Sequence, residues 1–418
     1  MGFFDFLKSK KIEDRFAISL DIGTEFVKAL IFEVEKDKAK VLGVGRYRQK
    51  LSDMQGGMVT DISGVIQNCQ AAIEIAGKQA KIIPRQVIVG IAGELVKGMT
   101  TRIKYIRENS KINISMPELK EVISKVQKVA FDKARSVLAW ETGRSEIDVK
   151  LVNAAVVDVK IDGYKVTNPL GFQGKEIEVG VYSAFAPIVH LGALQTIAEA
   201  LDLDLLSVVA EPYAVARCLA NATTSDFSAI FIDMGGGTSD IALVRQGGLE
   251  GTKMFALGGR AFTKRLAEVF YLSFGEAEEV KLDYSTGKMQ EQAKIAKVKQ
   301  ALFSDCQVWL SAVELTLEEF GEELLPTKIL LCGGGSSLPD IAQVLENSSW
   351  YANLPFPKKP QILFIKPTDV TSVVDTTGKL KQLQDVTPMA LANLAISLVG
   401  QETIFDSILS KLINSVKT

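Results

Sequence analysis

Two short segments of the sequence each carry an aspartate at the end of an apolar stretch, followed by a glycine turn and a threonine. The first segment runs from Phe16 through Asp21 to Thr24, and the second runs from Ala229 through Asp233 to Thr238. A second apolar stretch follows each turn, so each turn is predicted to be the tip of a β-hairpin. Glycine lets backbone N–H groups approach an anion closely, and carboxylates are ligands that Mg²⁺ prefers. We therefore expect the two hairpins to hold a magnesium-bound phosphate compound between them.

The metal ligands expected in this arrangement are Asp21 and Asp233. The expected phosphate donors are the backbone amides of the two turns, namely those of Gly23, Thr24, Gly235, Gly236, Gly237 and Thr238. In a Walker loop or a dinucleotide-binding fingerprint the glycines lead into a helix, whose N-terminus holds the anion. Both turns here lead into a strand instead, which excludes those two classes of phosphate site at these positions.

Three other features could complete such a site. The turn Gly333–Ser336 leads from a strand into a helix and could meet an adenosine or an α-phosphate, although a tight strand-to-helix connection also explains it. Glu211 begins a helical segment, where a carboxylate could orient a water or simply favour the helix N-terminus. Glu278 and Lys281 stand three residues apart on a helix and would ordinarily be a solvated pair.

Composition limits the remaining function classes. The chain has 418 residues, with 48 Lys and Arg against 50 Asp and Glu, and this balance argues against a nucleic-acid partner. A single histidine, His190, excludes a metal site built from several histidines. The four cysteines are widely scattered, which is typical of reduced thiols in a cytoplasmic protein. No apolar run reaches the roughly 18 residues of a transmembrane helix.

The C-terminal segment from residue 403 has the apolar periodicity of an amphipathic helix. Its apolar stripe includes Phe405, Ile408, Leu409, Leu412 and Ile413. Such a helix either packs on its own domain or lies in a membrane interface, and the sequence leaves both possibilities open. The N-terminal segment, residues 1–11, mixes phenylalanines with lysines and is expected to be a terminus docked on the body or in weak contact with a membrane surface.

Strands alternate with helices along the rest of the chain, which predicts an α/β protein with a similar core in each half. The expected helices cover residues 61–76, 116–129, 191–201, 258–274, 275–281, 289–319 and 337–346. The expected strands outside the hairpins cover residues 87–91, 151–160, 176–184, 328–332 and 362–365.

This set of motifs, in this order, resembles the actin-like ATPase superfamily. Its two phosphate motifs, two connecting helices and adenosine motif resemble residues 21–24, 233–240, 211–216, 388–398 and 331–336. The resemblance implies an α/β, actin-like (ribonuclease H-like) duplicated two-domain fold that binds ATP and Mg²⁺. It also implies that Asp21 and Asp233 carry the metal and that Glu211 aligns the attacking water. The other nucleotide-binding residues that it implies are Gly23, Thr24, Lys28, Gly235, Gly236, Gly237, Thr238, Glu278, Lys281, Gly334, Gly335 and Ser336.

Within that superfamily the sequence is similar to the FtsA family of bacterial cell division. The similar stretches are residues 57–61, 87–93 and 168–171, Gly258-Gly259 before a helix, and the amphipathic C-terminal segment. The resemblance implies an ATP-binding scaffold with weak ATPase activity at most, which polymerises into filaments and works with other division proteins. It implies binding to the FtsZ C-terminal tail, and a cytoplasmic location, peripheral on the inner face of the cell membrane.

The same resemblance divides the chain into subdomains, including an inserted 1C subdomain of the SHS2 type. The expected segments are 12–86 (first part of 1A), 87–184 (1C), 185–205 (second part of 1A), 206–256 (first part of 2A), 257–326 (2B), 327–385 (second part of 2A), 386–402 (closing helix of 1A) and 403–418 (C-terminal helix).

Two other functions remain open on the same fold. A PilM-like protein of type IV pilus assembly would bind a peptide of a membrane partner, and a small-molecule kinase would need a carboxylate base between the domains, for which no clear candidate exists. The sequence also departs from the family pattern at three places: Glu25 stands where a small polar residue beside the γ-phosphate is usual, Asn393 replaces a glycine, and the linker at residues 400–402 is short.

Overall fold

The computed structural model describes residues 15–143, 147–221 and 227–399. Its first half is a sheet with the strand order β11-β6-β1-β2-β3-β17. The strands β1 (Phe16–Ile22), β2 (Phe26–Glu35) and β3 (Lys38–Arg48) form an antiparallel meander. β6 (Gln86–Ile91) and β11 (Asp204–Ala210) continue the sheet in parallel on the side of β1, and the short β17 (Val373–Asp375) closes the other edge.

The second half repeats this arrangement. The strands β12 (Ala229–Met234), β13 (Ser239–Arg245) and β14 (Gly248–Phe255) form an antiparallel meander. β15 (Lys328–Cys332) and β16 (Gln361–Phe364) continue it in parallel on the side of β12. The hairpins β1–β2 and β12–β13 therefore occupy equivalent places in the two sheets, and the duplication predicted from the sequence is confirmed.

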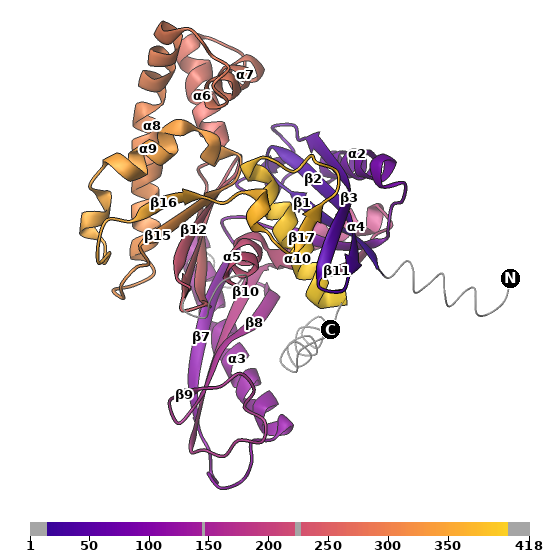
Figure 1. Cartoon of the computed structure of the whole chain (residues 1–418), viewed down its shortest axis with the longest axis vertical. Coiled ribbons are helices and arrows are strands. Elements are labelled where there is room, and N and C mark those ends of the chain that lie inside the picture. The colour runs from indigo at the N-terminus through magenta and orange to yellow at the C-terminus, as the bar shows by residue number, and fades with distance from the viewer. Residues whose placement is uncertain (1–14, 144–146, 222–226, 400–418) are drawn as a thin grey trace, which may run out of the picture.

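Helices cover the sheets and separate the two halves (Figure 1). On one face of the first sheet lies α2 (Ile62–Ala80), which approaches β3 so closely that a Cβ at Gly45 would lie 1.8 Å from the carbonyl oxygen of Ala72. Only glycine permits that approach. α4 (Ile188–Ala200) packs beside α2, and the hairpin of β4 (Met54–Gln55) and β5 (Met58–Val59) precedes α2.

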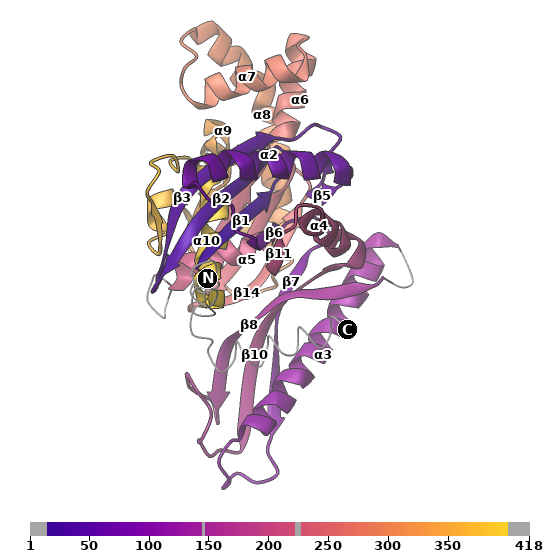
Figure 2. The same cartoon turned by 90° about the vertical axis from the view of Figure 1, so that its right-hand side faces the viewer.

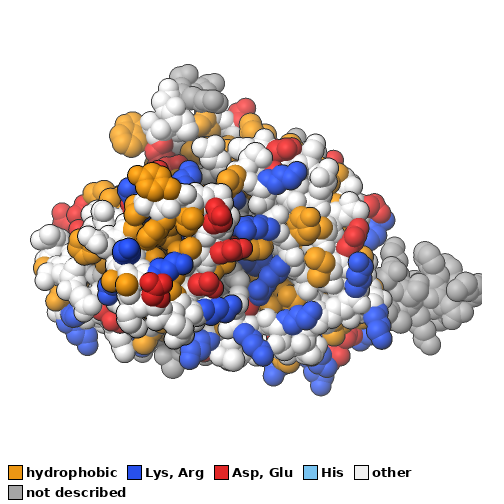
Figure 3. Space-filling model, turned by 90° about the horizontal axis from the view of Figure 1, so that it is seen from above, with side chains coloured by type: hydrophobic (Ala, Val, Ile, Leu, Met, Phe, Trp, Pro, Cys, Tyr) orange, Lys and Arg blue, Asp and Glu red, His pale blue; other side chains and the backbone are white. Residues whose placement is uncertain are grey.

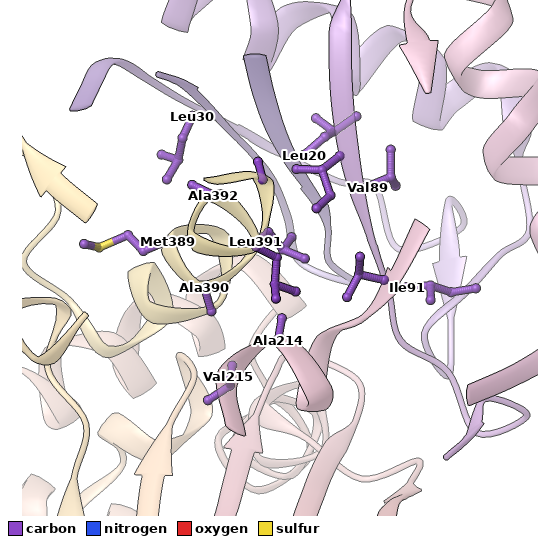
Figure 4. Close-up of a cluster of buried hydrophobic side chains, with 14 of the residues drawn as sticks. Leu20, Leu30, Val89, Ile91, Ala214, Val215, Met389, Ala390, Leu391 and Ala392 are labelled. Carbon is purple, nitrogen blue, oxygen red and sulfur yellow. The ribbon is translucent and has the colours of Figure 1, made fainter. Parts of the chain in front are cut away.

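Two helices pack against one another between the halves, α5 (Glu211–Asn221) and α10 (Val386–Val399). Ala214 of α5 and Ala390 and Leu391 of α10 are fully buried at this contact, together with strand residues of the first sheet (Figure 4). Small side chains on both helices let the two axes come close. Asn393 stands where the family pattern has a glycine. Its side-chain oxygen accepts a hydrogen bond from the Ser372 hydroxyl.

A helical layer belongs to the second half and lies at the top left in Figure 1. It consists of α6 (Gly259–Phe270), α7 (Phe274–Ser285), α8 (Gln292–Glu318) and α9 (Pro339–Asn347). These helices share a separate apolar core around Trp309, whose indole N–H donates to the Ser239 hydroxyl at 2.9 Å. On the face seen from above in Figure 3, acidic and basic side chains lie side by side, in line with the balanced composition.

Between β6 and α4 the chain forms an inserted module. It contains β7 (Lys97–Ile106), α3 (Met116–Thr142), β8 (Val149–Ile161), the short β9 (Tyr164–Lys165) and β10 (Glu176–Pro187). α3 runs along one face of the β7–β10–β8 sheet (Figure 2), and Leu119, Val122 and Val126 are completely buried against it. Its assignment to the SHS2 type, like the subdomain limits, stays a prediction.

The inserted sheet is hydrogen-bonded to the sheet of the second half. β7 pairs with β14 through Met99–Gly251 and Gly98–Thr252, so one nine-stranded sheet runs through both units. Tyr182 of β10 stacks on Tyr213 of α5, with ring centroids 5.1 Å apart, and shares a 3.0 Å hydrogen bond with Thr252. None of the described helices combines the length and the hydropathy that crossing a membrane requires.

Candidate functional site

A cavity of about 390 Å³ lies where the two hairpins converge. Both tips line it, and they touch each other: a Cβ at Gly236 would lie 2.9 Å from the Cβ of Glu25, and one at Gly237 would lie 2.8 Å from the Cγ2 of Thr24. The volume falls in the range of small-ligand sites. The predicted residues that line the cavity are Asp21, Gly23, Thr24, Lys28, Glu211, Asp233, Gly235, Gly236, Thr238, Glu278, Lys281, Gly334 and Gly335.

The register of each hairpin places a second ionisable side chain directly opposite each aspartate. Asp21 pairs with Lys28, and Asp233 pairs with Asp240. Lys28 binds the Asp21 carboxylate at 2.7 Å, whereas Oδ1 of Asp240 is buried without a hydrogen-bond partner among the described residues. Thr387, near the start of α10, donates a hydrogen bond to Asp233. The second hairpin thus presents two carboxylates to the cavity with no cation between them.

Glu211 adds a third uncompensated carboxylate at the start of α5. Burial raises the pKa of Glu211 well above its ordinary value, and the charges of Asp21, Asp240 and Asp233 raise it further. The pKa values of Asp233 and Asp240 are also raised, again chiefly by burial. Burial opposes the charge of Lys28, but the attraction and hydrogen bond of Asp21 outweigh it, so the Lys28 pKa is raised. Lys28 therefore faces three carboxylates, those of Asp21, Asp233 and Glu211.

This donor set fits a magnesium ion that arrives with a phosphate compound. In the described part of the chain, no three His, Cys, Asp or Glu side chains are arranged to hold a metal by themselves. Mg²⁺ does not need such a cage, because it keeps several waters and binds through one or two carboxylates plus phosphate oxygens. The orphaned Asp240 oxygen and the excess of carboxylates are what a hydrated cation would satisfy.

The raised pKa values predict how stability depends on pH without nucleotide. The folded state holds protons on Glu211, Asp233 and Asp240 that the unfolded state has already lost, so the free energy of unfolding falls as pH rises from the ordinary pKa of these groups toward their raised values. We expect the melting temperature to fall as pH rises above the ordinary pKa of these carboxyl groups, and to fall less in Asp240→Asn. Thermal unfolding at a series of pH values, without Mg²⁺, measures this dependence. Equal slopes of melting temperature against pH in the wild-type chain and in Asp240→Asn would contradict the prediction.

The glycine turns meet the prediction only in part. The Gly235 N–H closes the hairpin by donating to the Thr238 carbonyl at 2.9 Å, and the Gly235 carbonyl accepts from Gly259 at the start of α6. The Gly235 amide therefore already has a partner within the turn, and its role as a phosphate donor stays a prediction. The N–H groups of Gly236, Gly237 and Thr238 remain candidates, although Gly237 packs on Thr24 and does not itself line the cavity.

The predicted adenosine-side residues Glu278 and Lys281 also come together at the cavity. Glu278 and Lys281 form a 2.8 Å ion pair with side chains only 9% and 13% exposed, so they are not the solvated pair that their spacing alone suggests. Lys281 also donates to the Thr263 hydroxyl at 2.8 Å and to the Gly259 carbonyl at 3.1 Å. This network fixes α7 to the start of α6.

The third glycine turn lines the cavity through Gly333, Gly334 and Gly335. Gly333 has φ +84°, and a Cβ there would lie 2.1 Å from an Asp233 carboxylate oxygen, so glycine is required. Ser336 is buried behind the turn, donates to the Cys332 carbonyl and does not line the cavity, and its part in nucleotide binding stays a prediction. Its neighbour Ser337 lines the cavity in its place.

Three site features were missed from the sequence. Asp240 could have been found from the hairpin register, because it is the residue opposite Asp233. Arg48 lines the cavity as well, and Arg260 of α6, in the other half, binds Glu25. No local signal marks Arg260, since its contact depends on how the two halves are placed. The predicted membrane-facing residues Phe405, Ile408, Leu409, Leu412 and Ile413 lie outside the described residues.

Comparisons with known proteins agree with this architecture. The family model described as "Cell division protein FtsA" matches residues 230–376. Cell division protein FtsA of Pseudomonas aeruginosa is 24% identical over 79% of this chain and 80% of its own length. That of Enterococcus hirae is 25% identical over 90% of this chain and 86% of its own.

Among solved structures, a chain of the PilM-PilN type IV pilus biogenesis complex superposes with a TM-score of 0.63 and 18% identity, over 91% of this chain and 98% of that one. At this identity the likeness concerns the fold. The comparisons therefore confirm both resemblances predicted from the sequence: this chain has the actin-like fold, and over most of its length its sequence is similar to the FtsA cell-division proteins.

Proposed function

We propose that this chain binds ATP with Mg²⁺ between its two hairpins and uses the nucleotide as a conformational and assembly switch. The observation that carries the proposal is the convergence of Asp21, Asp233 and Asp240 on one cavity, beside glycine turns from both halves. A ligand held by both hairpins stabilises one relative placement of the halves, and this is how a nucleotide shifts a conformational equilibrium.

In this proposal each residue has a distinct task. Asp21 and Asp233 would hold the magnesium ion, one from each half, and Lys28 orients the Asp21 carboxylate. Candidate turn amides bind the phosphate oxygens, and Glu278, Lys281 and the Gly333–Gly335 turn surround the nucleoside. Glu211 accepts a hydrogen bond from the attacking water in a slow hydrolysis step, which suits a switch better than rapid turnover.

The similarity to FtsA proteins supports a cellular role for this switch. We propose that the chain forms filaments and links FtsZ to the inner face of the cell membrane together with other division proteins, from a cytoplasmic position. The FtsZ C-terminal tail would bind the helical layer of α6–α8, and the predicted stripe that includes Phe405 and Leu409 would contact the lipid.

One co-sedimentation experiment tests both contacts. The full chain with Mg-ATP is mixed with liposomes containing anionic lipid and with a labelled FtsZ tail peptide. We expect both the chain and the peptide to pellet, and we expect Phe405→Glu with Leu409→Glu to abolish pelleting of the chain without lowering its melting temperature. A matched control, Ser407→Glu with Ser410→Glu, places the same charges on the polar side of the predicted helix.

The alternative function is a PilM-like role in type IV pilus assembly, in which the chain binds a peptide of a membrane partner. The shared fold is its support. The same experiment separates the two functions. A chain that does not bind the FtsZ tail peptide, but does pull down a peptide of a pilus membrane protein, contradicts the division role.

A further inference from the structure

A carboxylate between two arginines joins the halves of the molecule at the hairpin tips. Glu25 follows Thr24 at the tip of β1–β2, and its side chain is 15% exposed. Its Oε1 atom accepts from Arg48, at the end of β3, at 2.7 and 2.8 Å. Its Oε2 atom accepts from Nε of Arg260, near the start of α6 in the other half, at 2.8 Å.

Arg260 also holds the backbone of the opposite half. Its Nη2 donates to the Thr24 carbonyl at 2.6 Å, and its Nη1 donates to the Met54 carbonyl at 3.2 Å. The Arg260 backbone N–H donates to the Gly236 carbonyl at 2.7 Å, so this one residue contacts both hairpin tips. The guanidinium is therefore fixed beside the place where the two tips meet.

This cluster lies beside the hairpin tips, whose turn amides are the candidate phosphate donors. Glu25 and Arg48 both line the cavity, and the Cβ of Glu25 faces Gly236. Lys281 and Gly334, which the proposed function assigns to the nucleoside, line the cavity from α7 and the third glycine turn. If the proposed nucleotide binds with its nucleoside against those residues, its last phosphate is the group nearest the two tips and therefore nearest Glu25.

We propose that Glu25, held between Arg48 and Arg260, sets the preference of this site between nucleoside diphosphate and triphosphate. Its carboxylate already occupies the two arginines that a terminal phosphate would otherwise attract, and its negative charge repels that phosphate. Arg260 has the opposite effect, because its charge favours the additional phosphate. The balance weakens triphosphate binding relative to diphosphate binding, compared with a site that has a neutral residue at position 25. This inference rests on the proposed nucleotide function and deepens it.

The test compares the dissociation constants of fluorescent Mg-ADP and a non-hydrolysable fluorescent Mg-ATP analogue in the full chain. Glu25→Gln keeps the size of the side chain but removes its charge, and we expect it to favour the triphosphate by about tenfold in the ratio of the two constants. Arg260→Gln is expected to shift the same ratio in the opposite direction. Both shifts should shrink as salt is raised, because the cluster is partly exposed.

A matched control and a folding check complete the experiment. Glu35→Gln removes a carboxylate at the other end of β2, where it pairs with Lys40, and it should leave the ratio unchanged. Melting temperatures without nucleotide show whether each variant folds. If Glu25→Gln does not fold, Glu25→Ser is tested in its place. An unchanged ratio in folded Glu25 variants overturns the inference. If the wild-type chain binds neither nucleotide, the proposed function itself fails, which is a separate outcome.

Discussion

Replacement of Asp233 by alanine is expected to weaken Mg-ATP binding by at least on the order of 100-fold while the chain remains folded. Asp233 stands at the end of β12, opposite Asp240, and faces the cavity from the second half. Without its carboxylate, a magnesium ion loses its contact on that side. The fold should persist because the substitution also removes one of several buried like charges that raise one another's pKa.

Isothermal titration with Mg-ATP, together with thermal unfolding of the nucleotide-free protein, measures both parts of this prediction. Asp233→Asn provides a stricter comparison, because it keeps an oxygen that can accept from Thr387. Asp204→Ala is the control, since that exposed aspartate pairs with Arg85 at the sheet edge, far from the cavity. Undiminished affinity in Asp233→Ala would show that the metal site has been assigned to the wrong residue.

Glu211→Gln is expected to retain nucleotide while losing hydrolysis. Glu211 begins α5, lines the cavity and is not hydrogen-bonded to either hairpin aspartate, so its loss leaves the proposed metal ligands in place. If it orients the attacking water, removing its basic oxygen should slow phosphate release by on the order of 100-fold. Nucleotide affinity should change by less than about threefold.

Single-turnover phosphate release, with the affinity measured separately, tests this expectation. The pH dependence provides a second criterion, because the raised pKa of Glu211 should appear as a loss of rate on the acidic side of the wild-type profile. Glu199→Gln, on the neighbouring helix α4, controls for the loss of one negative charge. A Glu211→Gln variant that hydrolyses ATP at the wild-type rate removes Glu211 from the reaction.

Much of the fold could be predicted because its signals are local. The two Asp-glycine-threonine turns between apolar stretches predicted hairpins whose register the structure confirms, and helices such as α8 follow the 3.6-residue period. The end of α3 was less visible. The helix continues to Thr142, beyond the end predicted at residue 129. This part was missed because only one face of it is buried, and Leu138 is the buried residue of its last turns.

The strands β3, β7, β11 and β14 were not predicted. Each is partly polar or contains glycine, so its own pattern is weak. β7 and β11 are stabilised by pairing with strands distant in the sequence, whereas β3 and β14 extend the hairpins β1–β2 and β12–β13. β3, for example, carries Gly43 and Gly45, which weaken a strand prediction but are required for the close approach of α2. Tertiary contacts therefore decide these elements.

The residues of the candidate site also differ in whether a local motif or a tertiary contact places them. Residues within a motif, such as Asp21, Gly236 and Gly334, were found because the motif itself places them at the cavity. The sequence did not indicate that Ser337 lines the cavity and Ser336 does not, because the direction of a side chain in a tight turn depends on its backbone dihedral angles. Arg260 could not be found, because its partner Glu25 is far away in the sequence and on the other half.

The short ladder between β7 and β14 has a mechanical consequence. The inserted module is continuous in sequence with the first half but hydrogen-bonded to the second at Gly98 and Met99. A change in the angle between the halves must therefore break that ladder or rotate the module as a rigid lever. Its helix α3 has 27 residues, a length of about 40 Å, so the far end of the lever travels further than the hairpins themselves. A sub-ångström movement around a phosphate would become a larger displacement at the far end of the inserted module, large enough to change its contacts with a neighbouring molecule.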